Sequence, residues 1–521
     1  MTLIVLIVCS VANGLSVSGA SRCYDSPSSI PTKFSKRKMG GPLSLVNRRS
    51  TRLSASVSGS DHNNSNTVSS KRKMLGFAIP ALGIFLMNPL LSNIDNMFVG
   101  KVTGTIGLAA LSPATICTDQ MLYLCSFLAR ATTGIVSASD DDTKQEAACT
   151  PLAASICVGL FLSLIYYLFT PSMLNALKVR PELQPMAKSY IYIRGAIASA
   201  ALLQSSCLSV LLASKDALTP LKIVAMAAMF NVCGDYLLCV KPFRLGCAGA
   251  SAATAGATLL SSFLLIRTLI QKRLIVTPIV PNFFRTAFTS GKKKWLELVT
   301  YAGPLLAITI TRLSGFLVMQ RTAMSLGVTQ LAGYQLCINL LLFFLLFGEP
   351  LSQLSQTNLP SLLFPSNNNT KAAKNDQITD LRKTLKSIIT LASGASIAVA
   401  TVAFLMARFG SGFFSSDAAV LAITHQTAPA IFFAVATAIF TVALDGAMLA
   451  SREFGFMFSC GISTFIMQLF MLPRAKSLTD IFATFTWRLG LYSVAILLRT
   501  NLFKRGLLGR ALKEEKMAKT A

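Results

Sequence analysis

Apolar runs long enough to cross a lipid bilayer recur along almost the whole of this 521-residue chain. Hydrophobic residues make up 53% of the sequence and charged residues only 13%, a balance that disfavours a soluble monomer. The runs have the length of helices and lack the alternation of barrel strands. A helix also satisfies its own backbone hydrogen bonds in lipid. The sequence therefore predicts an all-α, polytopic membrane protein.

Twelve apolar segments have the length and composition of transmembrane helices. They lie at 75–98, 105–137, 148–170, 186–213, 217–240, 246–270, 296–323, 329–358, 384–408, 421–447, 453–473 and 480–502. Glu349 and Pro350 predict a break in the eighth of them, because proline cannot donate a helical hydrogen bond. The chain is thus divided into a targeting segment 1–74, a first lobe 75–270, a basic linker 271–295, a second lobe 296–502 and a basic tail 503–521.

The net charge of +27 is concentrated in a few segments. Residues 1–74, 267–294, 371–386 and 499–521 together carry +24 of it. With twelve spans these segments share one face, which the positive-inside rule places, with both termini, on the cytosolic or stromal side. Basic charge could also indicate a nucleic-acid partner. Its position between and beside the spans favours topology and targeting instead, so we expect membrane lipids and no nucleic acid as partners.

The segment before the first apolar helix has the composition of a two-part targeting address. Residues 1–20 contain an apolar core followed by small residues, as in a secretory signal. Residues 21–74 are rich in Ser, Arg and Lys, and their only acids are Asp25 and Asp61, as in a transit peptide. A signal followed by such a stretch resembles the address of plastid proteins in algae with secondary plastids. The prediction is a plastid (chloroplast) envelope membrane; an ordinary signal with a basic tail, and another cellular membrane, is the alternative.

The two halves of the chain contain matching segments. "LLASKD" at 211–216 in the first half corresponds to "MLASRE" at 448–453 in the second. "GTIGLAAL" at 104–111 corresponds to "GVTQLAGY" at 327–334, and Pro80 in the first predicted helix corresponds to Pro304 in the seventh. Matches in the same order at similar offsets predict two pseudo-symmetric six-helix bundles, an architecture of secondary transporters.

Buried acids are the residues most relevant to how such a transporter would be driven. The chain has no GxxxxGK[ST] loop for ATP, so energy would come from an ion gradient. A carboxyl removed from water can take up and release a proton near neutral pH. Asp235 follows Asn231 by one helical turn in "MFNVCGDYLLCV", and Asp95 lies near the end of the first helix. These three are the predicted ion-coupling residues, for H⁺ or Na⁺ and with no other cofactor; the alternative for Asp95 is a cap at the membrane edge.

Further charged residues within the apolar segments predict a substrate cavity. They are Asp119, Arg194, Arg312 and Asp445. Arg194 could pair with Asp119 or attract an anion, and Arg321 could face the same cavity or extend to the interface. For each, an internal ion pair or an interfacial anchor is the alternative. Arginines near a cavity favour an anionic or aromatic-acid solute.

Other chemistries have little support in the sequence. The 12 cysteines form no CxxC pair, and two histidines cannot build a metal cluster with them, so no metal site is expected. No nucleophile–base pair or diphosphate motif indicates an enzyme. Three alternatives to an antiporter stay open: a flippase for lipid-linked precursors, which fourteen spans would favour, a channel, and a membrane enzyme.

Several segments, in the right order, resemble the multidrug and toxic compound extrusion (MATE) family, in particular its DinF-like and plant plastid-envelope branch. They are "NIDNMFVGKVTGTIGLAALSPATICTDQ", "LLASKDALTPLKIVAMAAMFNVCGDYLLC" and "GEPLSQLSQTNLP", within a resemblance that covers roughly residues 75–500. The resemblance implies twelve helices in two six-helix lobes that form a V and switch between inward-open and outward-open states.

The resemblance also implies roles for particular residues. In DinF-type members an aspartate in helix 1 and an Asn-x-x-x-Asp pair in helix 5 serve the coupling ion, and Asp95, Asn231 and Asp235 match them. Another branch uses a glutamate within helix 7, where this chain has Arg312 and Arg321. This departure favours coupling in the first lobe. We therefore expect a monomeric, cation-coupled antiporter, with the proton as the ion, that exports a small organic solute such as an aromatic or organic acid.

Overall fold

The computed structural model of the chain describes residues 61–139, 143–177, 179–240, 242–275, 291–364, 371–413, 418–502 and 509. Most of the predicted targeting segment, the linker from 276 to 290 and the predicted tail apart from residue 509 lie outside this set. Every regular element among the described residues is a helix, as the apolar runs predicted.

The helices follow one another in two groups. The first group contains α2 (Asp61–Leu124), α3 (Phe127–Ser137), α4 (Lys144–Ala176), α5 (Gln184–Ala196), α6 (Ala198–Ala213), α7 (Leu218–Asp235), η1 (Tyr236–Val240) and α8 (Cys247–Gln271). The second contains α10 (Gly291–Ser325), α11 (Val328–Leu345), η2 (Leu346–Gly348), α12 (Glu349–Asn358), α13 (Pro360–Leu363), α14 (Lys371–Leu405), η3 (Met406–Gly410), η4 (Ser411–Phe413), α15 (Ala418–Ala450), α16 (Phe454–Met471), η5 (Leu472–Arg474), α17 (Leu478–Leu497) and η6 (Leu498–Leu502).

Several spans are less regular than the sequence predicted. Ten helices in the described ranges are long and apolar enough to cross a membrane, and α5 with α6 would form an eleventh that bends by 51°. The segment predicted at 105–137 is helical but divided, because α2 ends at Leu124 and α3 begins at Phe127. α2 itself changes direction at Gly104, whose φ of 63° and ψ of −153° suit glycine alone. The break predicted at Glu349 is present, where the short helix η2 gives way to α12.

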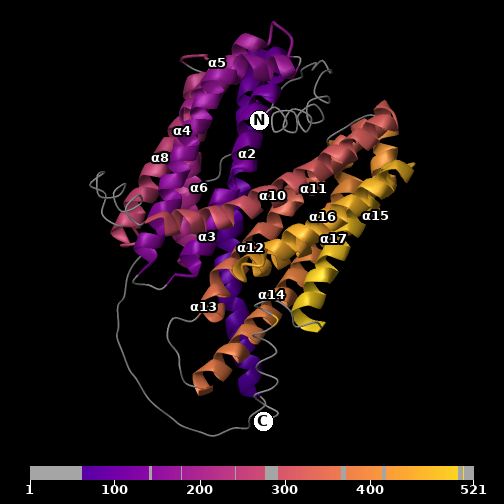
Figure 1. Ribbon diagram of the computed structural model, residues 1–521. Helices are drawn as coiled ribbons and strands as arrows, with labels where there is room; N and C mark the ends of the chain where they lie inside the picture. The colour runs from indigo at the N-terminus through magenta and orange to yellow at the C-terminus, as the bar shows by residue number, and fades with distance from the viewer. Residues whose placement is uncertain are drawn as a thin grey trace, which may run out of the picture.

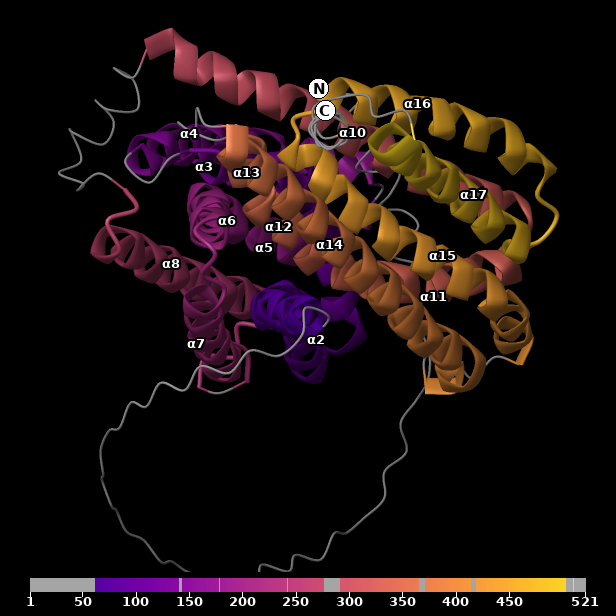
Figure 2. The same ribbon diagram turned by 90° about the horizontal axis from the view of Figure 1, so that it is seen from below.

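The two groups of helices form two bundles, which we call the N-lobe (α2–α8) and the C-lobe (α10–α17). In Figure 1 the bundles separate toward the end where α5 begins and come together toward the end that bears α13. Viewed along the perpendicular direction in Figure 2, α12 lies between the rest of the C-lobe and the N-lobe helices α3 and α6. A hydrophobic cluster with members from both lobes, including Leu128, Leu305 and Leu354, joins them there.

Ion pairs reinforce this junction at its polar end. Arg130 of α3 donates from Nη2 to Oε1 of Glu349 in α12 over 3.0 Å. Lys294 at the start of α10 contacts Glu146 at the start of α4, with Nζ and Oε2 2.8 Å apart. These residues lie on the side of the predicted basic segments. The lobes are therefore joined on that side and separate on the other.

The matching sequence segments have matching backbone geometry. Lys215 and Arg452, at equivalent places in "LLASKD" and "MLASRE", both have positive φ, 63° and 58°. Gly104 and Gly327, which begin the second pair of segments, have φ of 63° and 114°. Positive φ is uncommon outside glycine, so its recurrence at these offsets is what a duplicated unit predicts.

The acids that end these segments also have equivalent partners. Asp216 pairs with Lys272, directly after α8, the last helix of its lobe. Glu453 pairs with Arg499 in η6, at the end of the last helix of the other lobe. Each lobe thus connects the end of its fourth predicted span to the end of its sixth by one ion pair.

Candidate functional site

The candidate ion-coupling site is built by three N-lobe helices. α7 packs against both α2 and α8, and it carries Asn231 and Asp235 four residues apart, on one face. α2 supplies Asp95, which lies inside the helix rather than at its end and therefore does not act as a cap. Directly after Asp235 the chain passes into η1, a π-helical turn, and such turns occur frequently at functional sites.

One amide group connects the two carboxyls. Nδ2 of Asn231 donates to Oδ1 of Asp95 and to Oδ2 of Asp235, both over 3.0 Å. Asp95 is 7% exposed, and Asn231 and Asp235 are 0% exposed. The two carboxyls are thus held close together away from water, on one amide. Because like charges repel strongly in such surroundings, a proton on one of them is favoured. The arrangement therefore suits a site that holds a proton.

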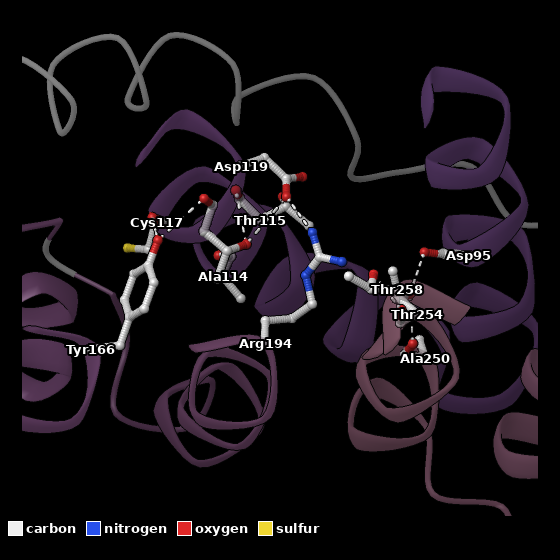
Figure 3. Close-up of polar contacts among 11 residues, drawn as sticks. Asp95, Ala114, Thr115, Cys117, Asp119, Tyr166, Arg194, Ala250, Thr254 and Thr258 are labelled. Carbon is white, nitrogen blue, oxygen red and sulfur yellow. Dashed lines mark hydrogen bonds and ion pairs between the residues drawn. The ribbon is translucent and has the colours of Figure 1, made fainter. Parts of the chain in front are cut away.

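A third helix completes the surroundings of Asp95. Oγ1 of Thr254, in α8, lies 3.2 Å from Oδ2 of Asp95 and 2.9 Å from the carbonyl oxygen of Ala250 (Figure 3). One hydroxyl has one hydrogen to donate, so Thr254 can serve only one of these acceptors at a time. Oδ1 of Asn231 and Oδ1 of Asp235 are buried with no hydrogen-bond partner in the described part of the chain. A proton or a small cation would supply what these two oxygens lack.

Asp119 and Arg194 form an ion pair in the same lobe. Nη2 of Arg194, from α5, lies 2.8 Å from Oδ1 of Asp119 in α2, as Figure 3 shows. The side chain of Asp119 is 46% exposed, whereas that of Arg194 is 14% exposed. The pairing that the sequence suggested is thus confirmed. The carboxyl of this pair is thus half-exposed, whereas the guanidinium is mostly covered.

Arg312 and Asp445 form the corresponding pair of the C-lobe. Arg312, in α10, donates to Oδ2 of Asp445 in α15. Oη of Tyr492, in α17, donates to Oδ1 of the same carboxyl over 2.8 Å. The four residues predicted to line a solute cavity therefore form two separate ion pairs, one in each lobe.

Arg488 is a buried charge that the sequence analysis did not select. It lies within α17, is 5% exposed, and donates from Nη1 to Oε1 of Gln468 over 2.9 Å. Its Nη2 donates to the carbonyl oxygen of Thr311 over 3.2 Å, and its guanidinium lies over the ring of Phe465. The available signal was an arginine in the middle of the last apolar segment, since such residues are rare and usually functional.

The acids and metal ligands of the remaining molecule add little to these sites. Helix α10 carries an acid, Glu297, near its start, where Nη1 of Arg452 lies 3.4 Å from its Oε1. Arg312 and Arg321 occupy its interior, as the sequence indicated. Within the described ranges no group of three His, Cys, Asp or Glu side chains is placed to hold a metal.

Comparisons with known proteins agree with this architecture. The family model MatE matches residues 80–237, the segment that contains the complete Asp95–Asn231–Asp235 site. "Protein DETOXIFICATION 47, chloroplastic" of Arabidopsis thaliana is 28% identical over 401 residues, 76% of this chain and 70% of that protein. The resemblance of the chain to the MATE family, seen in its sequence, is thereby confirmed.

Solved structures and a second relative extend the comparison. The crystal structure of the Vibrio cholerae MATE transporter VcmN in the bent form matches with a TM-score of 0.72. It covers 87% of this chain and 99% of its own at 16% identity. "Protein DETOXIFICATION 44, chloroplastic" of Arabidopsis thaliana is 24% identical over 78% of this chain and 77% of its own length. The all-helical fold in two bundles is confirmed, since the matching MATE transporters have twelve helices in two bundles. MATE proteins are transporters, not enzymes.

Proposed function

We propose that this MATE transporter is a proton-coupled antiporter that exports a small organic solute, and that Asp95, Asn231 and Asp235 bind the proton. The observation that carries the proposal is the single amide group of Asn231, whose Nδ2 lies 3.0 Å from each of two buried carboxyls. Two carboxylates buried this close together repel strongly, so such a pair retains one proton that two exposed acids would lose.

Proton uptake would change the forces between three helices. With one proton the site carries one negative charge, and with two it carries none. The second proton would remove the charge to which Nδ2 of Asn231 and the hydroxyl of Thr254 donate. Those hydrogen bonds would weaken, since bonds to an ionised acceptor are roughly twice as strong as neutral ones. α2, α7 and α8 could then repack, and the proton would drive transport to the extent that it binds one conformation more tightly than the other.

Sodium is the competing ion. Oδ1 of Asn231 and Oδ1 of Asp235 are oxygens without a partner among the described residues, and oxygens are what a hard cation binds. The proton is preferred because two carboxyls buried side by side on one amide favour retention of a proton.

We further propose that the protein resides in the plastid envelope with its basic face toward the stroma. Two observations support this location: the signal and transit-like composition of residues 1–74, and the word "chloroplastic" in the names of similar plant proteins. In that orientation the lobes are joined on the stromal side by Arg130 and Glu349. The conformation would therefore give access from the opposite side.

The test uses proteoliposomes incubated in a plastid metabolite extract under an imposed pH gradient. Wild-type vesicles should concentrate one or more small solutes above equilibrium, as read by mass spectrometry, and a protonophore should abolish this. Asp235→Asn should lose the accumulation. Asp380→Asn, the same change at an exposed carboxyl of α14, is the matched control and should retain it.

Three outcomes would contradict the proposal. Equal accumulation by Asp235→Asn would remove Asp235 from the mechanism. Accumulation that requires a sodium gradient, and not a pH gradient, would identify sodium as the coupling ion in place of the proton. Equilibration of solutes without accumulation, in wild type, would indicate a channel.

A further inference from the structure

Among the residues that the structure describes, the interior of the C-lobe contains more positive than negative charge. Arg312 of α10 and Arg488 of α17 line one cavity there, and Asp445 of α15 pairs with Arg312. Both carboxyl oxygens of Asp445 are already engaged, one by Arg312 and the other by Tyr492. No ion pair joins Arg488 to a carboxylate within the described ranges. The guanidinium of Arg488 is thus a buried charge without a counter-ion.

Hydrogen-bond donors are also in excess around Arg488. The guanidinium donates to Oε1 of Gln468 and to the carbonyl of Thr311, which leaves part of its five N–H groups unused. Gln468 is fully buried, and its Nε2 has no acceptor among the described residues. The amide cannot be turned round, because its oxygen must face a guanidinium that only donates. A buried donor without an acceptor lowers the stability of the fold. An acceptor with negative charge would therefore stabilise this cluster.

A cavity lies beside the cluster. It has a volume of about 30 Å³ and is lined by Arg312, Arg488, Tyr492 and Thr464 among apolar neighbours. That volume holds one or two waters or a single carboxylate head, and is far smaller than a pocket enclosing a whole ligand, typically ~300–1,000 Å³. Arg312, one of the lining residues, has a side chain that is 28% exposed, whereas Arg488 is buried.

A glycine leaves room for the guanidinium. A Cβ added at Gly315 of α10 would lie 1.8 Å from Nη1 of Arg488. Any other residue at this position would therefore displace the guanidinium, although the protein would keep its charge. The position of the charge depends on the absence of a side chain at residue 315.

We propose that Arg488 and Arg312, which line this cavity, form a subsite for the carboxylate group of an organic anion, with Gln468 beside Arg488. The inference rests on the proposed function, because the anion would be the exported solute or part of it. The planar fork of a guanidinium matches the two oxygens of a carboxylate, and the spare amide hydrogen of Gln468 adds a further donor. An anion bound there would supply the negative charge that the C-lobe interior lacks.

The first test needs only the wild-type protein. Binding of benzoate and of its neutral analogue benzamide to the purified full chain is measured by calorimetry near neutral pH, in methanesulfonate salts. Benzoate should bind at least tenfold more tightly than benzamide. Equal binding of the two, or no benzoate binding up to about 10 mM, would overturn the proposal. Binding of chloride but not of benzoate would also overturn it, because the site would then hold a simple halide.

Variants assign the binding to the cluster. Arg488→Gln should abolish the preference for benzoate, and Arg488→Lys should weaken benzoate binding at least tenfold, since an ammonium cannot reproduce the fork. Gly315→Ala keeps every charged group and should weaken benzoate binding by a similar factor. This variant replaces Arg488→Gln in the test if Arg488→Gln does not fold. Arg321→Gln, an exposed arginine of the same helix as Arg312, should change nothing. Unchanged affinity in both Arg488→Lys and Gly315→Ala would place the benzoate elsewhere and overturn the assignment.

Failure of this inference can be distinguished from failure of the proposed function. If the protein accumulates a cationic or neutral solute on a pH gradient and does not bind benzoate, the proposed function stands and the subsite is refuted. If Arg488 is needed for benzoate binding but the Asp235→Asn variant still accumulates solute, the subsite stands and the coupling role of Asp235 is refuted.

Discussion

The ion pair between Arg130 and Glu349 allows the relative movement of the two lobes to be tested by a single substitution. It joins α3 of the N-lobe to α12 of the C-lobe, with Nη2 and Oε1 3.0 Å apart. The pair exists only while the lobes are joined on the side of the basic segments. Glu349→Gln should therefore destabilise this conformation and leave the alternative one, open on that side, unaffected.

The size of the effect follows from burial. A fully exposed pair contributes about 0–1 kcal/mol, and a hydrogen bond to a charged group about 1.5–3 kcal/mol. The two side chains are 19% and 21% exposed, which places this pair between the limits, at about 1–2 kcal/mol. That corresponds to a roughly 5–30-fold change in the ratio of the two conformations. Lys294 and Glu146 are more exposed, so their pair should contribute less.

The ratio can be measured as a distance between the lobes. Spin labels on genetically encoded residues at Met186 in α5 and Met324 in α10, both exposed, report on the separated side. Glu349→Gln should raise the population of the short distance by the factor given above. Arg130→Gln should do the same, and the double variant should add little. Glu182→Gln, an exposed glutamate near the start of α5, is the control.

Two results would refute this reasoning. An unchanged distance distribution in Glu349→Gln would mean that the pair does not contribute to the balance between conformations. Additive effects of the two single variants, with a coupling energy below about 0.3–0.5 kcal/mol, would mean that Arg130 and Glu349 act independently.

Further predictions follow from single residues. Asp95→Asn should abolish gradient-driven accumulation but retain exchange of labelled solute across vesicles without a gradient, because the solute site is separate. Gly104→Ala should lower stability by about 1–3 kcal/mol in thermal unfolding, since its φ of 63° and ψ of −153° suit glycine alone. Gly446→Ala should cost about 1–3 kcal/mol, because a Cβ would lie 2.4 Å from a backbone oxygen of α12. Burial raises the pKa of Asp216, but its bond with Lys272 and other hydrogen bonds outweigh this and hold that pKa below its ordinary value. Its stabilisation is complete above the unfolded-state pKa and is lost as the pH falls through the lowered folded-state pKa, so Asp216→Asn should lower Tm near pH 7 and have less effect near pH 3.

Local features of the structure could be predicted from the sequence because local rules determine them. Apolar runs of bilayer length form helices since no other structure satisfies a backbone in lipid. Pro350 interrupts a helix through its missing N–H, and the break occurs directly before Glu349. Asn231 and Asp235 share a face because four residues make one helical turn.

Other features depend on contacts between distant segments and could not be predicted in this way. Asn231 is far from Asp95 along the chain, and only packing of α7 on α2 brings them together. Arg488 has no acid within one turn of its own helix, so its partners on α10 and α16 could not be read from its neighbours. The division of the second predicted span at Cys125 has no proline or glycine to signal it.

The duplication suggests how one scaffold can hold charges of opposite sign. Gln468 follows Asn231 at the same offset that separates "LLASKD" from "MLASRE". An amide both donates and accepts, so Asn231 can serve the carboxyls of Asp95 and Asp235 through its nitrogen, while Gln468 serves the guanidinium of Arg488 through its oxygen. The sign of the charge at each site is then determined by the residues that surround an amide at the equivalent position of each lobe. A proton would neutralise the N-lobe site and an organic anion the C-lobe site. Because the two sites are in different lobes, exchange of one ligand for the other would depend on the apolar core and ion pairs that join the lobes.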